Sequence, residues 1–460
     1  MSRVSRIVTA LELPAVLAMA PALLFPTTER MTVLAVMPVL WLGARLSTGR
    51  AIPNTPFNVV LWTLLTMVGV SLYATYDVRF SLGKVAGVIF GVLLFWAAGR
   101  WMTTPARLWS AGATFLLAGA GLAAAGLLGT NWADKFPVFA SVSGSLPRAI
   151  RGVPGAVDGF HPNAVAGSLV LFIPLQIALL ATGVHRWLAG AQASRISEKA
   201  MFAGQALLLV LTAGTLALTQ SRGAWAGMLV AGLSFLCWHS RQTRLVAVVA
   251  LLLVLACGVS VGPERLLNVA ISRTGPGMAG NVTGRAELWS RALYGIRDFP
   301  LTGMGMNTFR RVMPAMYPAP SVPPDVDIAH AHNQLLQAGL DLGVPGLCAY
   351  VALWLLAAML LVQVYRESDA RPYRVLAGGI GAGLVAHCVF SMTDAIPLGS
   401  KVGILFWLTL ALTVGLHRIA AASRTDSKAY GRSLPHSSRS WLWKMSRAGT
   451  RPSVHRRRTS

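Results

Sequence analysis

Apolar segments of about twenty residues recur along the whole chain, and short polar connections separate most of them. An α-helix needs roughly 20 predominantly apolar residues to cross the hydrocarbon core of a membrane. The pattern therefore predicts twelve membrane-spanning helices. Their approximate ranges are residues 8–26, 31–46, 57–75, 82–99, 108–128, 162–183, 200–219, 222–239, 243–262, 333–363, 373–395 and 397–417.

The composition agrees with this all-α, polytopic membrane fold. Of the 460 residues, 54% are hydrophobic and 12% are charged, and the mean hydropathy is +0.58. A soluble chain is typically about one quarter charged, so the composition excludes a soluble globular protein.

The distribution of basic residues predicts how the chain is oriented. If the N-terminus is cytoplasmic, the short outer connections hold only a few basic residues, chiefly Arg30, Arg79 and Lys84. Positive charge in short loops favours the cytoplasmic side. The inner loops then contain Arg45, Arg50, Arg100, Arg107, Arg186, Arg195, Lys199, Arg241, Arg244, Arg366, Arg371 and Arg374. Twelve spans place the C-terminus in the cytoplasm as well.

The net charge of +24 comes partly from the C-terminal end of the chain. Residues 419–460 contain ten Lys or Arg residues and one acid. They predict a disordered cytoplasmic tail that lies against anionic lipid head groups, whereas residues 1–418 form the transmembrane domain. Because much of the other basic charge lies in loops between apolar segments, the expected partners include membrane lipids and no nucleic acid.

Two connections on the outer side are long, residues 129–161 and 263–332. Loops of this length are usually functional or disordered. Their positive charge comes almost entirely from arginine, whose planar guanidinium group suits bidentate binding of phosphate. We expect a phosphate-bearing ligand at the outer face, and contact with anionic lipid head groups is the alternative. The arginines are Arg148, Arg151, Arg265, Arg273, Arg285, Arg291, Arg297, Arg310 and Arg311.

The second long loop has helical patterning. Within residues 284–299, apolar residues such as Leu288 and Ala292 recur one turn apart, which indicates an amphipathic helix. The simplest prediction is a helix that lies on the membrane surface and is anchored by Trp289. A shorter helix is expected over residues 307–317.

A polar stripe follows this loop. Asn333, Gln337 and Asp341 are four residues apart and share one helix face, directly after His330 and His332. Ionisable groups within a membrane helix mark a functional site by default. His332 is the candidate general base, because imidazole titrates near neutral pH. A purely hydrogen-bonding role is the alternative.

The segment from Asp325 to His332 also offers carboxylate and imidazole groups to a divalent metal ion. No further cluster has the spacing of a ligand set. Neither a metal nor another cofactor is therefore predicted.

Two arginines are expected to join His332 at the outer rim. Arg222 begins the eighth span next to Gly223 and Gly227, a spacing of small residues that lets another helix approach closely. It would lie at a helix N-terminus, where the helix dipole favours an anion. Arg285 begins the amphipathic helix in the same way. A structural arginine that reaches the membrane interface is the alternative for Arg222.

Four stretches, in this order, resemble the O-antigen ligase and O-antigen polymerase-like membrane proteins. Together they cover roughly residues 155–355. They are Gly159-Phe-His-Pro-Asn-Ala-Val-Ala-Gly167, Gln220-Ser-Arg-Gly-Ala-Trp225, Gly284-Arg285 through Gly303-Met-Gly-Met-Asn-Thr-Phe309, and His332-Asn333 through Gly346.

The resemblance implies an inverting, metal-independent glycosyltransferase with a GT-C-like fold, active at the outer, periplasmic face of a bacterial inner membrane. Such proteins take a glycan from undecaprenyl diphosphate and join it to an acceptor, which is lipid A-core in the ligases. By position, His332 would be the general base, and Arg222 and Arg285 would bind the diphosphate leaving group.

The remaining candidate residues are expected to support this site. The family pattern has Glu where this chain has Asp341, and the shorter carboxylate suits a hydrogen-bonding role. The supporting set is Asn333, Gln337, Asp341, His330, Arg148 and Arg151.

The motifs leave the activity open between a ligase and a polymerase that joins repeat units. A twelve-span transporter is the alternative from another class. Transporters typically place polar sites near the membrane midplane and contain internal repeats. The sequence shows no such repeat, and its ionisable groups gather at the outer rim.

Overall fold

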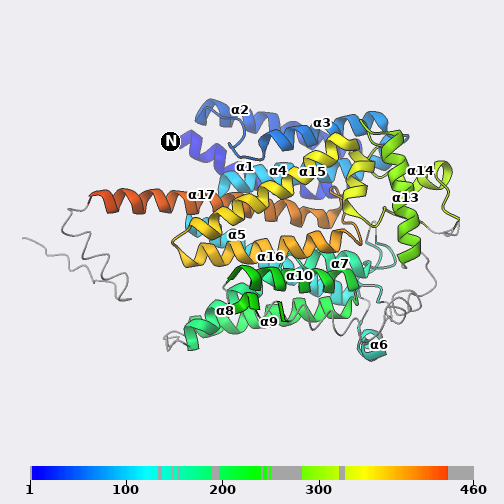
Figure 1. The fold of residues 1–460 in the computed structure, drawn as a ribbon. Coiled ribbons are helices and arrows are strands. Elements are labelled where there is room, and N and C mark those ends of the chain that lie inside the picture. Colours follow the sequence, from blue (N-terminus) through cyan, green and yellow to red (C-terminus); the bar gives the residue numbers. More distant parts are fainter. Residues whose placement is uncertain are drawn as a thin grey trace, which may run out of the picture.

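The computed structural model describes residues 3–132, 137–147, 149–153, 156–188, 196–239, 242–245, 248–249, 282–320 and 327–433. In these ranges the chain is helical and contains no strand, only two isolated β-bridges. Most helices run side by side in one bundle (Figure 1). Their bounds are α1 Arg3–Leu24, η1 Arg30–Ala35, α2 Val36–Thr48, α3 Asn58–Ala74, α4 Val78–Trp101, α5 Pro105–Gly129, α6 Pro137–Ser145, α7 Pro162–Leu169, α8 Ile173–Leu188, α9 Ile196–Leu218, α10 Arg222–His239, α13 Val282–Asp298, α14 Phe309–Met316, α15 Gln334–Glu367, α16 Arg371–Ser391, η3 Lys401–Gly403 and α17 Ile404–Ser433.

Six helices in the described ranges are long and apolar enough to cross a membrane, and α7 with α8 forms a seventh if the bent pair is one span. Residues 10–24, 58–74 and 222–237 are apolar but shorter. These findings fit a polytopic membrane protein. The ninth expected span, residues 243–262, lies almost entirely outside the described residues, so the number of twelve stays a prediction.

The core of the bundle forms around α4, which is apolar on all sides. A helix of this kind is stable only when other helices surround it, and α4 packs against α1, α3, α17 and η3. Two glycines allow the close approach: a Cβ on Gly87 would collide with the backbone of Gly399, and a Cβ on Gly91 with the ring of Trp407. Trp96 and Trp407 are fully buried in this core.

The long helix α15 is interrupted near its start. Gly343 has φ 66° and ψ −177°, a conformation that essentially only glycine adopts without strain. The loop after α13 occupies the break, where the Met304 amide donates to the Leu340 carbonyl at 2.7 Å and the Val344 amide to the Pro300 carbonyl at 2.7 Å. The expected single span over residues 333–363 is therefore a short segment that carries the polar residues, followed by a longer membrane helix.

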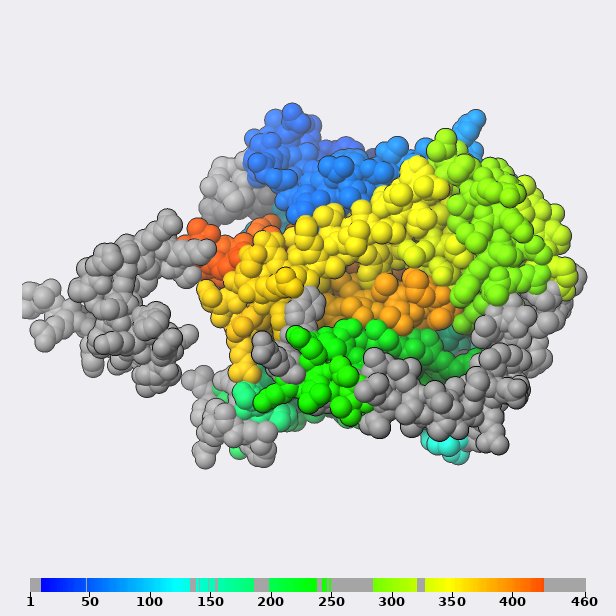
Figure 2. Space-filling view, viewed as in Figure 1, coloured from blue at the N-terminus to red at the C-terminus, as the bar shows by residue number. Residues whose placement is uncertain are grey.

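The amphipathic helix forms as expected, at α13, and the shorter helix is α14. The apolar face of α13, however, does not lie on a membrane surface. Leu288 and Ala292 are fully buried in a small core with Phe309 and Leu340, so α13 packs on α14 and α15 instead. Figure 2 shows the segment of α13 and α14, in yellow-green, covering one end of the bundle.

The start of α1 and the end of α17 lie at the other end of the bundle, opposite α13 and α14 (Figure 1). The last expected span ends near residue 417, but α17 continues to Ser433. Residues 434–460 are outside the described ranges, and the organisation of the basic tail stays a prediction.

Candidate active site

His332 lies on the loop that enters α15, at the end of the bundle covered by α13. Its backbone has φ 49°, a left-handed conformation that is uncommon outside glycine and that clusters at functional sites. Asn333 fixes the turn, because its side-chain oxygen accepts hydrogen bonds from the amides of Leu335 and Leu336 at 3.0 and 3.1 Å. Its amide group donates to the Met392 carbonyl at 3.2 Å. Asn333 thus caps the helix and joins it to α16.

Asp394 is the residue around which the site is built. It follows α16 and is 3% exposed. Its Oδ1 lies 3.0 Å from His332 Nδ1 and accepts from the Ala395 amide at 2.8 Å, whereas its Oδ2 accepts from the Asn163 amide group at 2.5 Å. Both carboxylate oxygens therefore have hydrogen-bond partners.

These contacts determine the protonation state of the pair. Burial raises the pKa of Asp394, but the hydrogen bond to His332 and the electrostatic interactions with His330, His332 and Arg285 outweigh burial and bring the pKa below its ordinary value. An ionised carboxylate only accepts hydrogen bonds, so Nδ1 of His332 carries the proton. Nε2 is then the nitrogen that can accept a proton from a substrate.

The sequence patterns did not single out Asp394 or Asn163 as candidate site residues. Asn163 caps nothing itself but belongs to the first turn of α7, in the stretch that carries the family resemblance, and Asp394 is a lone acid at the end of an apolar span. Asp394 could have been found from the sequence, since acids within membrane spans are functional candidates by default. Neither residue is near His332 in sequence, and only the packing of α7, α15 and α16 brings them together.

His330 is a secondary member of the site. Its Nε2 lies 3.7 Å from Asp394 Oδ1, and its Nδ1 accepts from the His332 amide at 3.3 Å. Burial lowers the pKa of His330 to about 3, against the opposing charge of Asp394. His330 is thus neutral near neutral pH and shapes the loop that carries His332.

The polar stripe supports the same loop from below. Gln337 accepts from the Ala331 amide at 2.9 Å and donates to Asp341 Oδ1 at 2.9 Å. The same oxygen of Asp341 accepts from the Asn307 amide at 3.2 Å. Gln337 and Asp341 therefore join the His332 loop to the segment between α13 and α14, and their role in a site stays a prediction.

The two arginines approach the site from different helices. Arg222 is the first residue of α10, and α10 packs on α16 through its small residues: a Cβ on Gly223 would collide with Thr393, and one on Gly227 with the Ala386 carbonyl. The packing places Arg222 beside the segment that carries Asp394. Its side chain is exposed.

Arg285 lies in the first turn of α13 and interacts electrostatically with both Asp394 and Arg222. Burial lowers its pKa, and its Nε is buried without a hydrogen-bond partner among the described residues. A buried donor left unpaired costs about 1–3 kcal/mol. Arg285 is therefore suited to an anionic ligand that would satisfy this donor.

The other arginines of the outer loops have different roles. Arg310 forms a bidentate ion pair with Asp327, and Arg291 pairs with Glu287. Arg151 is exposed, and no contact joins it to His332 or Asp394 in the described ranges. Arg148 lies outside those ranges, so its supporting role stays a prediction.

The structure changes the set of residues that a metal ion could use. His330, His332 and Asp394 each offer one donor atom, all within 4.8 Å of one another. Asp327 instead pairs with Arg310, and Asp325 is outside the described ranges. Because each oxygen of Asp394 already accepts a hydrogen bond, a cation would have to replace these bonds, and the arrangement fits a hydrogen-bonded His–Asp pair better.

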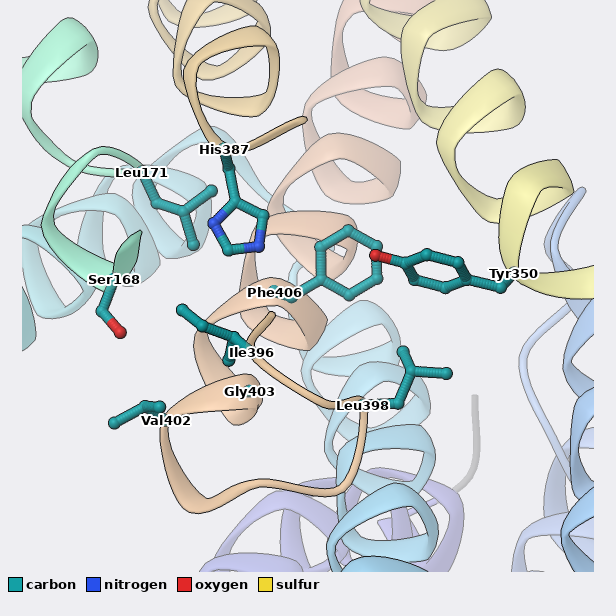
Figure 3. Close-up of a pocket in the computed structure, with 9 residues that line it drawn as sticks. All are labelled: Ser168, Leu171, Tyr350, His387, Ile396, Leu398, Val402, Gly403 and Phe406. Atoms are coloured by element: carbon teal, nitrogen blue, oxygen red, sulfur yellow. The ribbon is translucent and has the colours of Figure 1, made fainter. Parts of the chain in front are cut away.

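A buried histidine, His387, lies outside this site. His387 Nδ1 lies 2.7 Å from the Gly167 carbonyl, and its ring stacks on Trp354. It lines a cavity of about 10 Å³, room for about one water molecule, beside Tyr350 and Phe406 (Figure 3). The loop after Asp394 closes this cavity with Ile396 and Leu398, so the cavity is part of the packing that holds the loop.

The packing of α10 on α16 gives a testable expectation. Gly227→Leu forces a side chain into the Ala386 backbone and should lower the thermal unfolding temperature of the detergent-purified protein, since overpacking costs about 1–3 kcal/mol. Gly232→Leu is the matched control, because a Cβ at Gly232 meets nothing within 4 Å. Equal unfolding temperatures for the two variants would contradict this packing.

Part of the chain matches a known protein family. No curated protein matches the chain. Residues 207–351 match the family described as O-antigen ligase, and this stretch includes Arg222, Arg285 and His332, whereas Asn163 and Asp394 lie outside it. The match indicates a glycosyltransferase-like enzyme that handles a lipid-linked glycan and a lipid acceptor in general. The resemblance noted in the sequence motifs is confirmed over residues 207–351, which match the O-antigen ligase family.

Proposed function

We propose that the protein transfers a glycan from undecaprenyl diphosphate to an acceptor hydroxyl, and that lipid A-core is the acceptor. One observation carries the proposal: a His–Asp pair, His332 with Asp394, lies beside two arginines that approach from other helices. The pair can remove a proton from a hydroxyl group, and the arginines can bind a departing diphosphate. The family match at residues 207–351 supports the same class of activity.

In the proposed reaction, Nε2 of His332 accepts the proton of the acceptor hydroxyl as its oxygen bonds to the anomeric carbon of the glycan. The bond from that carbon to the phosphate oxygen breaks, and its electron pair leaves with undecaprenyl diphosphate. Asp394 stabilises the imidazolium cation that forms. Arg222 and Arg285 neutralise the charge that develops on the diphosphate, where fixed positive groups contribute most to the rate.

Attack from the side opposite the leaving group would invert the anomeric carbon. The proposed reaction uses no metal ion, because the arginines supply the positive charge at the diphosphate. It also needs no nucleotide sugar, since the lipid carries the activated glycan.

We further propose twelve spans in a bacterial inner membrane, with both termini cytoplasmic and the site facing the periplasm. The excess of Lys and Arg in the expected inner loops supports this orientation. The position of α13 and α14 opposite the start of α1 and the end of α17 is compatible with it (Figure 1).

The experiment that tests this proposal is transfer in vitro. The purified protein in proteoliposomes receives an undecaprenyl-diphosphate-linked glycan, with or without lipid A-core. Glycan on lipid A-core supports the ligase, and a lengthened lipid-linked glycan would instead identify a polymerase. If neither product forms, glycan transfer by this protein is contradicted.

Arg222→Lys should lower the rate of transfer about 10- to 100-fold. Lysine keeps the charge but loses the planar fork that can form two parallel hydrogen bonds to phosphate, and a charge-assisted hydrogen bond is worth about 1.5–3 kcal/mol. The matched control is Arg297→Lys on α13, whose side chain is 76% exposed and which should be nearly unaffected. Normal turnover of Arg222→Lys would rule out bidentate binding by Arg222.

A further inference from the structure

Lys84 is a cation in this end of the bundle that the proposed reaction does not use. It lies in the second turn of α4, and the loop that follows Asp394 packs directly on it, because a Cβ on Gly399 would collide with the Lys84 carbonyl. Its side chain is partly exposed. No residue in the described ranges forms a hydrogen bond or an ion pair with it. The ammonium group is therefore available to a ligand.

The surroundings of Lys84 are positively charged. It interacts electrostatically with one acid, Asp341, and with two further cations, Arg310 and Lys401. His330 interacts in turn with Lys84, which links the lysine to the loop that carries His332. An excess of positive charge in a partly buried position costs free energy unless an anion balances it.

The nearby acids are already bound to other groups. Asp341 Oδ1 accepts hydrogen bonds from Gln337 and from the Asn307 amide. Asp327 forms its bidentate pair with Arg310. Neither acid lies within ion-pair distance of Lys84, so the compensating anion is not supplied by these residues.

Lys84 and the two arginines reach the site from different parts of the bundle. α4 packs against α1, α3, α17 and η3, whereas α10, which begins with Arg222, packs against α7, α8 and α16. In Figure 1, α4 lies above α16, which leads to Asp394, and α10 lies below α16. The site thus has two cationic flanks, with the His–Asp pair between them.

We propose that Lys84 binds an anionic group, a phosphate or a carboxylate, on the acceptor glycan. This inference rests on the proposed function. In an in-line displacement the acceptor oxygen and the leaving group lie on opposite sides of the anomeric carbon. If Arg222 and Arg285 bind the departing diphosphate, the cation on the opposite flank faces the acceptor. Lys84 is then a specificity-determining residue that selects an acidic acceptor.

The test measures transfer in proteoliposomes with three forms of one acceptor. They are untreated lipid A-core, lipid A-core dephosphorylated with hydrogen fluoride, and lipid A-core with its carboxyl groups reduced to alcohols. Lys84→Met should raise the acceptor KM on the untreated form about 10- to 100-fold, the loss expected for one charge-assisted hydrogen bond, and leave the donor KM unchanged. Lys84→Arg, which keeps the charge, should recover most of the affinity.

The two modified acceptors identify the group that is bound. On the form that lacks this group, wild type and Lys84→Met should have the same acceptor KM. Arg79→Met is the matched control: Arg79 lies in the first turn of the same helix with an exposed side chain, and its acceptor KM should not change.

Three results would overturn the inference while leaving glycan transfer intact. They are an unchanged acceptor KM in Lys84→Met, an equal change on all three acceptors, and a change in donor KM. An equal loss of kcat on all three forms, in Lys84→Met and Lys84→Arg alike, would assign Lys84 a purely structural role. If wild type transfers nothing to untreated lipid A-core, the proposed ligase function itself fails, and the inference fails with it.

Discussion

His332→Ala is expected to lower the rate of glycan transfer on the order of 10³-fold, because removal of a general base typically costs 10²- to 10⁴-fold. Nδ1 of His332 lies 3.0 Å from Oδ1 of Asp394. Loss of the imidazole therefore removes the proton acceptor and leaves a buried carboxylate without one of its hydrogen-bond partners. The measurement is single-turnover transfer in proteoliposomes at matched membrane levels.

His332→Gln separates the base from a hydrogen-bonding role. Glutamine can still donate to Asp394 but cannot take up a proton near neutral pH, so it should be as inactive as alanine. His330→Ala is the matched control, since His330 lies 3.7 Å from Asp394 and should cost less than about tenfold. Near-normal transfer by His332→Gln would remove the general-base assignment and leave His332 as a structural residue.

Asp394→Asn is expected to have an effect of similar size, on the order of 10³-fold. The amide group can present its N–H to Nδ1 of His332 and shift the imidazole proton to Nε2, the nitrogen that must be free to accept. Asparagine nearly matches aspartate in shape, so the protein should remain in the membrane. A pH series should not restore activity, because the substituted amide does not titrate. Transfer within about tenfold of wild type would show that the tautomer of His332 does not depend on Asp394.

Asp298→Asn is the control for this variant. Asp298 ends α13 and accepts a hydrogen bond from Tyr317 at 2.8 Å, away from His332.

The lowered pKa of Asp394 also predicts how the stability of the protein depends on pH. A carboxyl whose pKa is lowered by folding stabilises the protein above its unfolded pKa, and the contribution is lost as the pH falls through the folded value. Asp394 should therefore contribute across the neutral range and lose its effect only in strong acid.

Local patterns predicted many of the helices and singled out three candidate site residues. Segment hydrophobicity predicted helices that match α4, α5, α9 and α16 closely. Arg222, Arg285 and His332 were each identifiable because a polar residue at the boundary of an apolar segment is visible within a few residues of sequence. Such local patterns do not predict which helix ends come together in the folded protein.

Long-range packing decided the rest of the site. Asp394 is 62 residues from His332 and 231 from Asn163, and no periodicity relates such distant positions. Long-range packing also decided what covers the amphipathic helix. Its apolar face was evident from the sequence and was expected to lie on a membrane surface, but α14 and α15 cover it. A helix pattern identifies a face that must be buried and leaves its partner undetermined.

The sequence alone predicts a membrane protein built from helices, Arg222 at the start of an apolar helix, and a polar stripe after His332. These properties depend on hydrophobicity and on the helical period, which act over one or two turns. Helix packing, by contrast, pairs Asp394 with His332, brings the loop after α13 into the break of α15 at Gly343, and places Lys84 and Arg222 on helices with different neighbours. The physical reason is that glycine contacts and buried hydrogen bonds between helices fix which helix ends meet, and those interactions join residues far apart in the chain.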